Sequence, residues 1–215
     1  MLRWTLFESI RDLALMPIEL FTRHFLGLFF LMIGLLYGCR SLGLSQRCGY
    51  SHIHYGEPGS ATWWHRQSFN LFRAAILGVC LARIPFPIDG WLGMIEPLYQ
   101  PGILLIGVAL QLIAFALISY VQGYLNADWR SGIDQDHPPS LITDGPYGRS
   151  RNPIFLAILI GQFGFFLALP SLFSLVCLVV GAGVILRQAR AEESALNRLH
   201  GSAYEEYRHR VPRWL

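Results

Sequence analysis

The chain has 215 residues, of which 53% are hydrophobic and only 14% are charged. Soluble domains carry roughly 25% charged residues, and the apolar residues here fall in long runs, so the composition excludes an ordinary soluble domain. It also excludes collagen-like, disordered and disulfide-rich secreted chains. The net charge of +3 says little by itself. We therefore expect an all-α integral membrane protein, a polytopic helix bundle with no nucleic-acid partner.

Apolar runs predict about five membrane-spanning helices, because a helix needs roughly 20 apolar residues to cross a hydrocarbon core about 30 Å thick. In chain order, the first three are expected over residues 25–39, 71–86 and 102–125. The second is the weakest of them, since arginines bracket it and prolines end it. The third is the clearest, since it contains no charged residue.

The last two spans are expected as a helical hairpin. Residues 154–186 form an uncharged stretch that is too long for one span and a little short for two. Pro170 and Ser171 fall at its middle, so the hairpin should turn at Leu169–Ser171. At the other end of the chain, helical spacing of Leu6, Ile10 and Leu13 predicts an interfacial helix rather than a cleavable signal peptide.

These elements divide the chain into two regions. Residues 1–125 should hold the first three spans and a cytoplasmic loop at 40–70. Residues 126–215 should form a cofactor region, made of a loop at 126–153, the hairpin at 154–186 and C-terminal helices at 187–215, the last of them amphipathic and cytoplasmic.

The arginines predict the orientation of the bundle by the positive-inside rule. They gather in the loop at 40–70, in residues 126–152 and in the tail after Leu186, whereas residues 85–101 hold none. This places the N-terminus outside and the C-terminus in the cytoplasm. We expect a bacterial inner membrane as the location and the cytoplasmic leaflet as the level of any chemistry.

The segment Leu141–Phe155, which leads into the hairpin, is one candidate for binding. Gly145-Pro146 and Asn152-Pro153 should each make a turn, and proline is tolerated at the first helical position because its missing N–H would be unpaired anyway. An ordinary positively flanked helix start explains these residues equally. The functional interpretation is an anion or cofactor cradle, in which turn N–H groups and arginines converge at a helix N-terminus.

Two neighbouring carboxylates in the tail form a second candidate. On a helical wheel, Glu192 falls between Leu196 and Leu199, and Glu193 borders the same apolar stripe from the other side. An unpaired carboxylate facing the protein is costly, so we expect a partner or a ligand. The simplest alternative is a salt bridge from Glu192 to Arg149 or Arg151.

The last residues predict a short helix. Gly201 should stop the preceding helix, and Ser202 with Glu205 should form a capping box that opens the next one. Tyr204 and Tyr207 then share a face by their spacing. They serve either as aromatic anchors at the lipid interface or as part of a binding site.

Two other sets of residues carry weaker signals. His52, His54 and His65 lie in one loop, but they lack a firm fourth ligand, so no metal site is expected. Arg73 and Arg83 flank the second span, and we expect both to extend toward the headgroups.

Taken together in this order, the motifs resemble the pattern of one protein family. Gly145–Phe155, the hairpin, Arg190-Ala-Glu-Glu193, Gly201-x-x-Tyr-x-x-Tyr207 and Val211-Pro-Arg resemble a prokaryotic-type member of the isoprenylcysteine carboxyl methyltransferase family, with its phospholipid N-methyltransferase relatives. The resemblance covers roughly residues 125–215. It implies an integral membrane enzyme that uses S-adenosylmethionine in a pocket between the hairpin and the tail, with an acceptor opening that faces lipid.

The resemblance also implies roles for particular residues. Glu192 matches the acidic cofactor ligand, suited to the methionine ammonium. The rest of the expected cofactor site consists of Pro139, Ser140, Leu141, Ile142, Gly145, Tyr147, Arg151, Asn152, Pro153, Ile154 and Phe155. Asn152 stands where the eukaryotic pattern has histidine, and Phe155 where it has tyrosine.

The catalytic residues expected from the resemblance are Arg187, Arg190 and Glu193. The arginine of the family pattern falls on Gln188 here, with Arg187 and Arg190 on either side, so either could orient a carboxylate acceptor. An amine or thiol acceptor would want a base, for which Glu193 or His200 could serve. The acceptor itself, a lipophilic molecule or lipid entering from the membrane, and the oligomeric state are left open.

Two other functions compete with this one. A sterol-type reductase that uses NADPH has a similar tail and topology, but its pattern places an acidic residue just after the position of Phe155, where this chain has none. The other is a non-catalytic membrane scaffold, in which Glu192 and Glu193 are structural. Binding of S-adenosylhomocysteine against NADPH separates all three.

Overall fold

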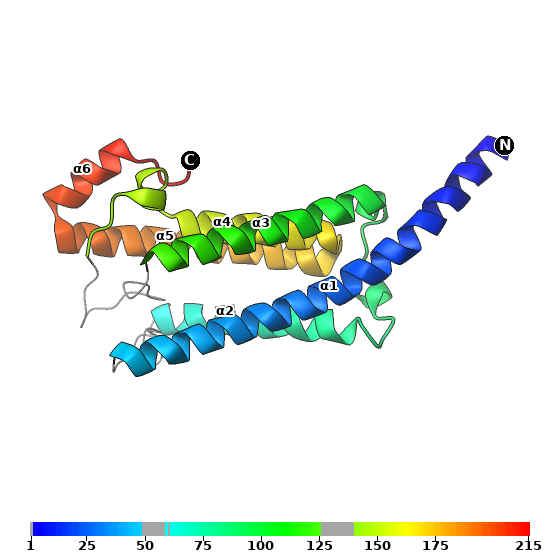
Figure 1. Cartoon of the computed structure of the whole chain (residues 1–215), viewed down its shortest axis with the longest axis horizontal. Coiled ribbons are helices and arrows are strands. Elements are labelled where there is room, and N and C mark those ends of the chain that lie inside the picture. Colours follow the sequence, from blue (N-terminus) through cyan, green and yellow to red (C-terminus); the bar gives the residue numbers. More distant parts are fainter. Residues whose placement is uncertain (1, 49–58, 60, 126–139) are drawn as a thin grey trace.

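The structure is a computed structural model, and it describes residues 2–48, 59, 61–125 and 140–215. Throughout these ranges the chain is helical or irregular, and the α-helices are α1 (Leu2–Cys48), α2 (Ala61–Ala82), α3 (Pro101–Leu125), α4 (Pro153–Ala168), α5 (Leu172–His200) and α6 (Ser202–Arg210). In Figure 1, α1 and α2 lie alongside each other, α3, α4 and α5 form a second group, and α6 covers one end of that group. The expected all-α helix bundle is therefore confirmed.

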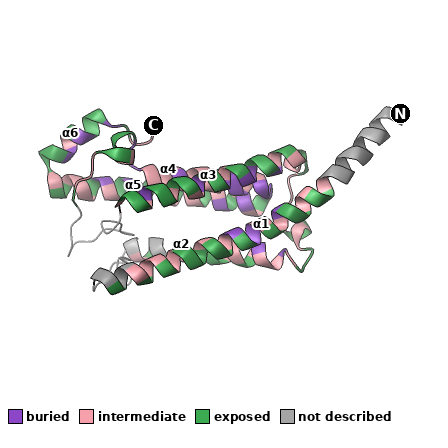
Figure 2. Ribbon diagram, viewed as in Figure 1, coloured by how far each residue is buried: buried purple, intermediate pink, exposed green. Residues whose placement is uncertain are grey.

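Three of these helices are long and apolar enough to cross a membrane. They are the part of α1 at Leu15–Gly43, the whole of α3 and the whole of α5. Two shorter apolar helices, Gln67–Ala82 and Pro153–Ala168, occupy the places of the other two expected spans. The count of five spans stays a prediction. Large hydrophobic residues are exposed, among them Leu28, Leu105 and Ile106, as they would be in lipid. Figure 2 shows exposed positions, in green, along α1 and α3.

The first two helices extend further than the sequence indicated. The expected span at 25–39 lies inside a single helix that runs from Leu2 to Cys48 and has Pro17 within it, rather than following a separate interfacial helix. α2 starts at Ala61, so both ends of the expected loop at 40–70 are helical. Apolar periodicity finds the lipid-facing part of a helix, but polar residues at its ends continue the helix beyond that part.

Glycines bring α3 and α4 into close contact. A Cβ placed on Gly107 would lie 2.2 Å from the backbone nitrogen of Ala168 and 2.6 Å from the carbonyl oxygen of Gly164. A Cβ on Gly164 would lie 2.8 Å from the carbonyl oxygen of Gly107. Small residues at a helix interface let two backbones approach in this way, which is the usual means of packing helices in a membrane. These two helices therefore form the rigid core of the bundle.

The expected hairpin turn is confirmed. α4 ends at Ala168 and α5 begins at Leu172. The Ser171 and Ser174 side chains form a capping box there, each accepting a hydrogen bond from the other's backbone N–H at 3.2 Å. The segment before α3 pairs with this turn, since Ile95 N–H donates to the Pro170 carbonyl at 2.9 Å.

The end of the hairpin differs from the expected division at residue 187. α5 continues without a break to His200, so the tail helix is the far end of the second hairpin arm. Gly201 then stops the helix, as expected, with a φ of 53°. The expected capping box at Ser202 and Glu205 is wrong: Gly201 itself occupies the N-cap of α6, and no side chain caps the helix.

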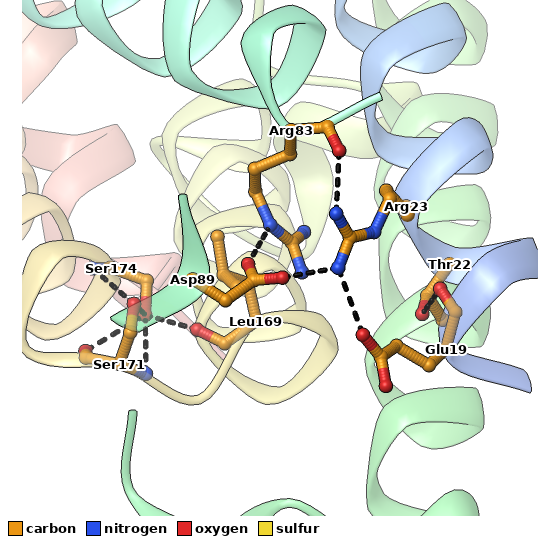
Figure 3. Close-up of polar contacts among 8 residues, drawn as sticks. All are labelled: Glu19, Thr22, Arg23, Arg83, Asp89, Leu169, Ser171 and Ser174. Carbon is orange, nitrogen blue, oxygen red and sulfur yellow. Dashed lines mark hydrogen bonds and ion pairs between the residues drawn. The ribbon is translucent and has the colours of Figure 1, made fainter. Parts of the chain in front are cut away.

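A charged cluster closes the end of the bundle opposite α6 (Figure 3). Arg83 is only 1% exposed, and its Nε donates to an Asp89 carboxylate oxygen at 2.5 Å. Arg23 pairs with the other carboxylate oxygen of Asp89, with Glu19 at 2.9 Å, and with the carbonyl oxygen of Arg83 at 2.7 Å. The expectation that Arg83 extends toward the headgroups is therefore wrong. A carboxylate on the α2–α3 connection holds it inside instead.

Candidate functional site

Glu193 organises the other end of the bundle. Its side chain, on α5, is buried, and its two oxygens accept four hydrogen bonds. Arg151 Nη1 donates at 3.1 Å and Asn152 Nδ2 at 2.8 Å. Arg213 donates through Nε at 2.8 Å and through Nη2 at 2.9 Å, in the two-pronged geometry that gives strong arginine–carboxylate pairs. Glu193 therefore joins the start of α4, the end of α5 and the C-terminal tail.

The local sequence explains why these groups meet. α4 begins at Pro153, which needs no hydrogen bond at the first helical position. The Asn152 side chain makes no capping bond and turns to Glu193 instead. The tail then runs beside the segment before α4, where Arg151 N–H donates to the Pro212 carbonyl at 3.0 Å and Ser150 Oγ to the Arg213 carbonyl at 3.2 Å.

An aromatic pair fixes α6 over this site. The rings of Tyr204 and Tyr207 are 5.9 Å apart and inclined edge to face, and both side chains are buried with Val211 against Leu141. The Tyr207 hydroxyl donates to the Tyr147 carbonyl at 2.8 Å. Burial, reinforced by the neighbouring Tyr204, raises the pKa of Tyr207 to about 12, so it keeps its proton at neutral pH. The pair therefore packs inside the protein rather than anchoring it to lipid.

A cavity of about 1090 Å³ runs from this cluster into the bundle. Ligand pockets usually measure about 300–1,000 Å³, so this cavity is as large as the largest of them. Its polar end is lined by Arg40, Arg73, Ser140, Arg151, Asn152, Gln188, Glu192, Glu193 and Arg198. Further in, the lining is mainly apolar and aromatic, with side chains such as Phe30, Phe115, Ile158 and Phe165. The cavity thus connects a charged mouth to an apolar interior.

Most residues expected to bind the cofactor line this cavity. They are Ser140, Leu141, Ile142, Tyr147, Arg151, Asn152, Ile154, Phe155 and Glu192. Glu192 accepts a hydrogen bond from Gln188 Nε2 at 2.8 Å, while the salt bridge to Arg151 that was the simplest alternative for Glu192 belongs to Glu193. Both adjacent carboxylates thus line the cavity, and Glu193 is the one that pairs with Arg151 and Arg213.

The other three expected cofactor residues are Pro139, Gly145 and Pro153. Pro139 lies outside the described residues. Gly145 adopts a φ of 54° in the turn of η4 (Gly145–Gly148), and a Cβ there would lie 2.5 Å from the Tyr124 ring. Pro153 starts α4. For Gly145 and Pro153, local structure alone explains the residue type.

The expected catalytic arginines do not reach the cavity. Arg187 and Arg190 are exposed on α5, and neither lines the cavity; Arg190 borders a separate, smaller pocket beside Arg213. The arginines that do line it on the first two helices are Arg40 and Arg73. Which arginine orients an acceptor therefore stays a prediction. The turn of α5 around residue 188 points the flanking arginines away from the cavity.

Sequence reasoning also missed several contributors to the site. Arg213 stands out in the sequence only as part of a motif, and its partner Glu193 cannot be inferred without knowing how the tail folds back. Arg40 donates to the Gln122 carbonyl at 2.6 Å, and Arg73 lies over the rings of Tyr37 and Phe69. In the sequence both resemble flanking charges of membrane spans. His52 and His54 lie outside the described residues, and His65 lies in α2.

The fold and the cavity define an integral membrane protein with a binding chamber that opens at one end. A family model for phospholipid methyltransferases matches residues 102–203, and over these residues the chain is similar to that family. The match begins at α3, earlier than the resemblance indicated, and ends before the Val211-Pro-Arg motif. This similarity suggests a membrane methyltransferase. No curated protein and no solved structure matches the chain.

Proposed function

We propose that the protein is an S-adenosylmethionine-dependent methyltransferase that methylates a lipophilic acceptor within the membrane. The observation that carries this proposal is the continuous cavity, which joins a charged mouth to an apolar interior and is as large as the largest ligand pockets. A charged cofactor suits the mouth, and an apolar acceptor suits the interior. The family match at residues 102–203 supports the same activity.

The cofactor would lie at the charged mouth. Glu192, on the cavity wall, offers a carboxylate to the methionine ammonium of the cofactor, and charge-assisted hydrogen bonds of this kind are the strong ones. Arg151 is held by Glu193, so it lines the mouth in a fixed position. Ser140, Leu141 and Ile142 supply one wall, and Tyr147, Ile154 and Phe155 supply another.

The chain's own residues have a modest chemical task. Bound S-adenosylmethionine supplies a methyl group that is already activated, so the protein needs no nucleophile of its own. Holding donor and acceptor in line can contribute about 7–11 kcal/mol to lowering a barrier. The apolar lining excludes water from the reacting groups. Two guanidinium groups and an amide keep Glu193 ionised, which favours a positioning role for it over that of a base.

Arg40 and Arg73 are the residues we assign to orienting the acceptor. Both line the cavity, Arg40 from α1 and Arg73 from α2. Arg73 lies over two aromatic rings, an arrangement that favours a cation. An acceptor with an anionic or strongly polar head would meet these arginines on arrival from lipid.

The membrane orientation follows from the same end of the bundle. Arg40, Arg151 and Arg198 line the cavity, and Arg213 pairs with Glu193 at its margin. At the opposite end, Arg23 and Arg83 are neutralised by Glu19 and Asp89. By the positive-inside rule, the mouth and the C-terminus face the cytoplasm. We propose five spans in a bacterial inner membrane. A reporter fused after Leu215 should be active only when it is a cytoplasmic reporter.

Substitution of Glu192 by Gln tests the cofactor site, because it keeps the shape and removes the charge. Calorimetry in detergent should show that the affinity for S-adenosylhomocysteine falls by more than about tenfold, or 1.4 kcal/mol. Glu206→Gln, on an exposed carboxylate of α6, is the matched control and should leave the affinity unchanged. If Glu192→Gln lowers the melting temperature and keeps full affinity, Glu192 is structural and the site assignment fails.

The same measurement distinguishes the proposed methyltransferase from the two alternative functions, an NADPH-dependent reductase and a non-catalytic scaffold. The protein should bind S-adenosylhomocysteine and show no saturable binding of NADPH. Binding of NADPH alone would indicate a reductase, and binding of neither would indicate a scaffold. Both results contradict the proposed function.

A further inference from the structure

Two glutamines lie deep in the cavity, inside helices that are otherwise apolar. Gln111 is on α3, ten positions after its first residue, and Gln162 is on α4. Both line the cavity. Nothing in the proposed cofactor site uses them, since they lie beyond its reach: α4 rises about 15 Å between Asn152 and Gln162.

Gln111 has no hydrogen-bond partner among the described residues. Its side chain is 1% exposed, and both its amide nitrogen and its amide oxygen are buried without a partner. The amide oxygen of Gln162 is in the same state. Buried polar atoms are almost always paired in folded proteins, and an exception calls for an explanation such as a missing ligand. Hydrophobic residues would fill these positions at no such cost.

The packing around the two glutamines keeps them from finding partners in the protein. Gly164 presses against the backbone nitrogen of Gln111, where a Cβ would come within 3.0 Å. Gln162 lies against Gly181 of α5, so closely that a Cβ on Gly181 would meet its amide at 2.4 Å. Glycine at position 181 leaves room for the Gln162 amide beside the cavity. Aromatic side chains that line the same cavity, such as Phe30 and Phe165, offer no conventional acceptor.

The unpaired atoms define what would satisfy them. Gln111 has a free donor and a free acceptor, and Gln162 adds a second acceptor. A ligand that only accepts, such as an ester or ketone oxygen, would leave both amide oxygens unpaired. A hydroxyl group donates one hydrogen bond and accepts others, so it can accept from the Gln111 amide nitrogen and donate to one of the two amide oxygens.

We infer that Gln111, with Gln162, binds a hydroxyl group carried on the apolar body of the acceptor, well inside the cavity and away from the end that reacts. This inference rests on the proposed function in taking the cavity for the acceptor chamber. The two glutamines would then fix how deeply the acceptor lies. A molecule of the same length without a hydroxyl at that depth would leave Gln111 unpaired, and it would bind less well.

Binding of octadecanoic acid and its monohydroxylated isomers to the full-length protein tests the inference. The isomers differ only in which carbon carries the hydroxyl group, so the series measures how far into the cavity the hydroxyl group must lie. No cofactor is present, so the result does not depend on methyl transfer. We expect one isomer, or two adjacent ones, to bind about five- to tenfold more tightly than octadecanoic acid, the range for one or two hydrogen bonds. Equal binding by all isomers would overturn the inference.

Substitution of Gln111 by Leu should abolish the preference for the hydroxylated isomer. The variant removes a buried group without a partner, so it should melt at the same temperature as the native protein or higher. Gln100→Leu makes the same chemical change at an exposed position outside the cavity and should keep the full preference. A preference that survives Gln111→Leu would overturn the inference.

A second pair of variants tests Gln162 through its neighbour. Gly181→Ala should displace the Gln162 amide and weaken the preference about threefold, in the range of a lost weak hydrogen bond. Gly183→Ala, where a Cβ meets nothing within 4 Å, should have no effect. An unaltered preference in Gly181→Ala would exclude Gln162 from the site. Failure of S-adenosylhomocysteine to bind, with the hydroxyl preference intact, would contradict the proposed function alone.

Discussion

The two ends of the bundle both rely on arginine–carboxylate contacts, but they use them differently. At one end, Asp89 joins Arg23 and Arg83, and the cluster closes the bundle around a buried guanidinium. At the other end, Glu193 joins Arg151 and Arg213 at the margin of the large cavity. The same kind of contact therefore joins helices at the first end and fixes residues of the cavity wall at the second. Stability should depend mainly on the first, and ligand binding on the second.

The largest effect is expected from Asp89→Ala at the closed end. It leaves the buried Arg83 without its carboxylate, and breaking a buried pair by removing one partner costs about 3–5 kcal/mol. Thermal unfolding in detergent should show a large fall in melting temperature. Folded protein should still bind S-adenosylhomocysteine normally.

The control for this prediction is the exposed pair of Glu205 and Arg208, 3.1 Å apart on α6. Glu205→Ala should cost only about 0–1 kcal/mol, as exposed ion pairs do. An equal loss in both variants would show that burial at Asp89 does not matter. Loss of cofactor affinity in Asp89→Ala would contradict the separation of the two ends.

Gly107→Ala should destabilise the helix pair that lies between the ends. Its Cβ would lie 2.2 Å from the backbone of α4, where no side chain can move aside. Overpacking of this kind costs about 1–3 kcal/mol. Gly102→Ala on the same helix, where nothing lies within 4 Å, should be neutral or stabilising. Equal melting temperatures for the two variants would contradict the close contact of α3 and α4.

Asn152→Leu at the open end should reduce cofactor binding more than stability. It removes the hydrogen bond to Glu193 and a polar group from the cavity wall, so affinity for S-adenosylhomocysteine should fall by at least about tenfold, or 1.4 kcal/mol. Calorimetry and thermal unfolding on one preparation compare the two effects. Unchanged affinity in a folded variant would count against the cofactor site.

Tyr207→Phe is expected to have the smallest effect. It removes one neutral hydrogen bond to the Tyr147 carbonyl and keeps the ring in its aromatic contact, so about 1 kcal/mol of stability should be lost. Cofactor affinity should fall slightly, because Tyr147 lines the cavity. Tyr120→Phe, at an exposed position on α3, is the control. A larger loss of cofactor affinity in Tyr207→Phe than in Asn152→Leu would contradict this prediction.

The sequence predicted the helices and the hairpin turn because they follow from local signals. Long apolar runs identify helices in a membrane, and Pro170-Ser171 marks a turn regardless of distant contacts. The helix ends were less predictable, since α1 and α5 continue through polar residues. Likewise, a helical wheel placed both Glu192 and Glu193 near the apolar stripe of the helix. Which of them pairs with arginine depends on where the C-terminal tail lies. That contact joins residues far apart in the chain.

The roles of Arg83 and of the cavity arginines likewise depend on contacts that the sequence does not reveal. A flanking arginine and a buried one look alike in sequence, because Asp89 becomes a partner only when the α2–α3 connection folds back. Arg187 and Arg190 are near the motif along the chain, yet they point away from the cavity. Arg40 and Arg73 are distant from the motif, although folding brings them to the cavity. Only residues that act through local geometry could be placed from sequence.

The unbroken length of α5 would set the depth of the proposed reaction. From Leu172, beside the hairpin turn, to Glu193 the helix rises about 32 Å, slightly more than the roughly 30 Å of hydrocarbon in a bilayer. With the turn at one boundary, Glu192 and Glu193 reach the level of the lipid headgroups at the other. Bilayer thickness thus becomes a variable of the enzyme. In a thicker membrane the cavity mouth would sink into hydrocarbon unless the helices straightened, and in a thinner one they would have to tilt.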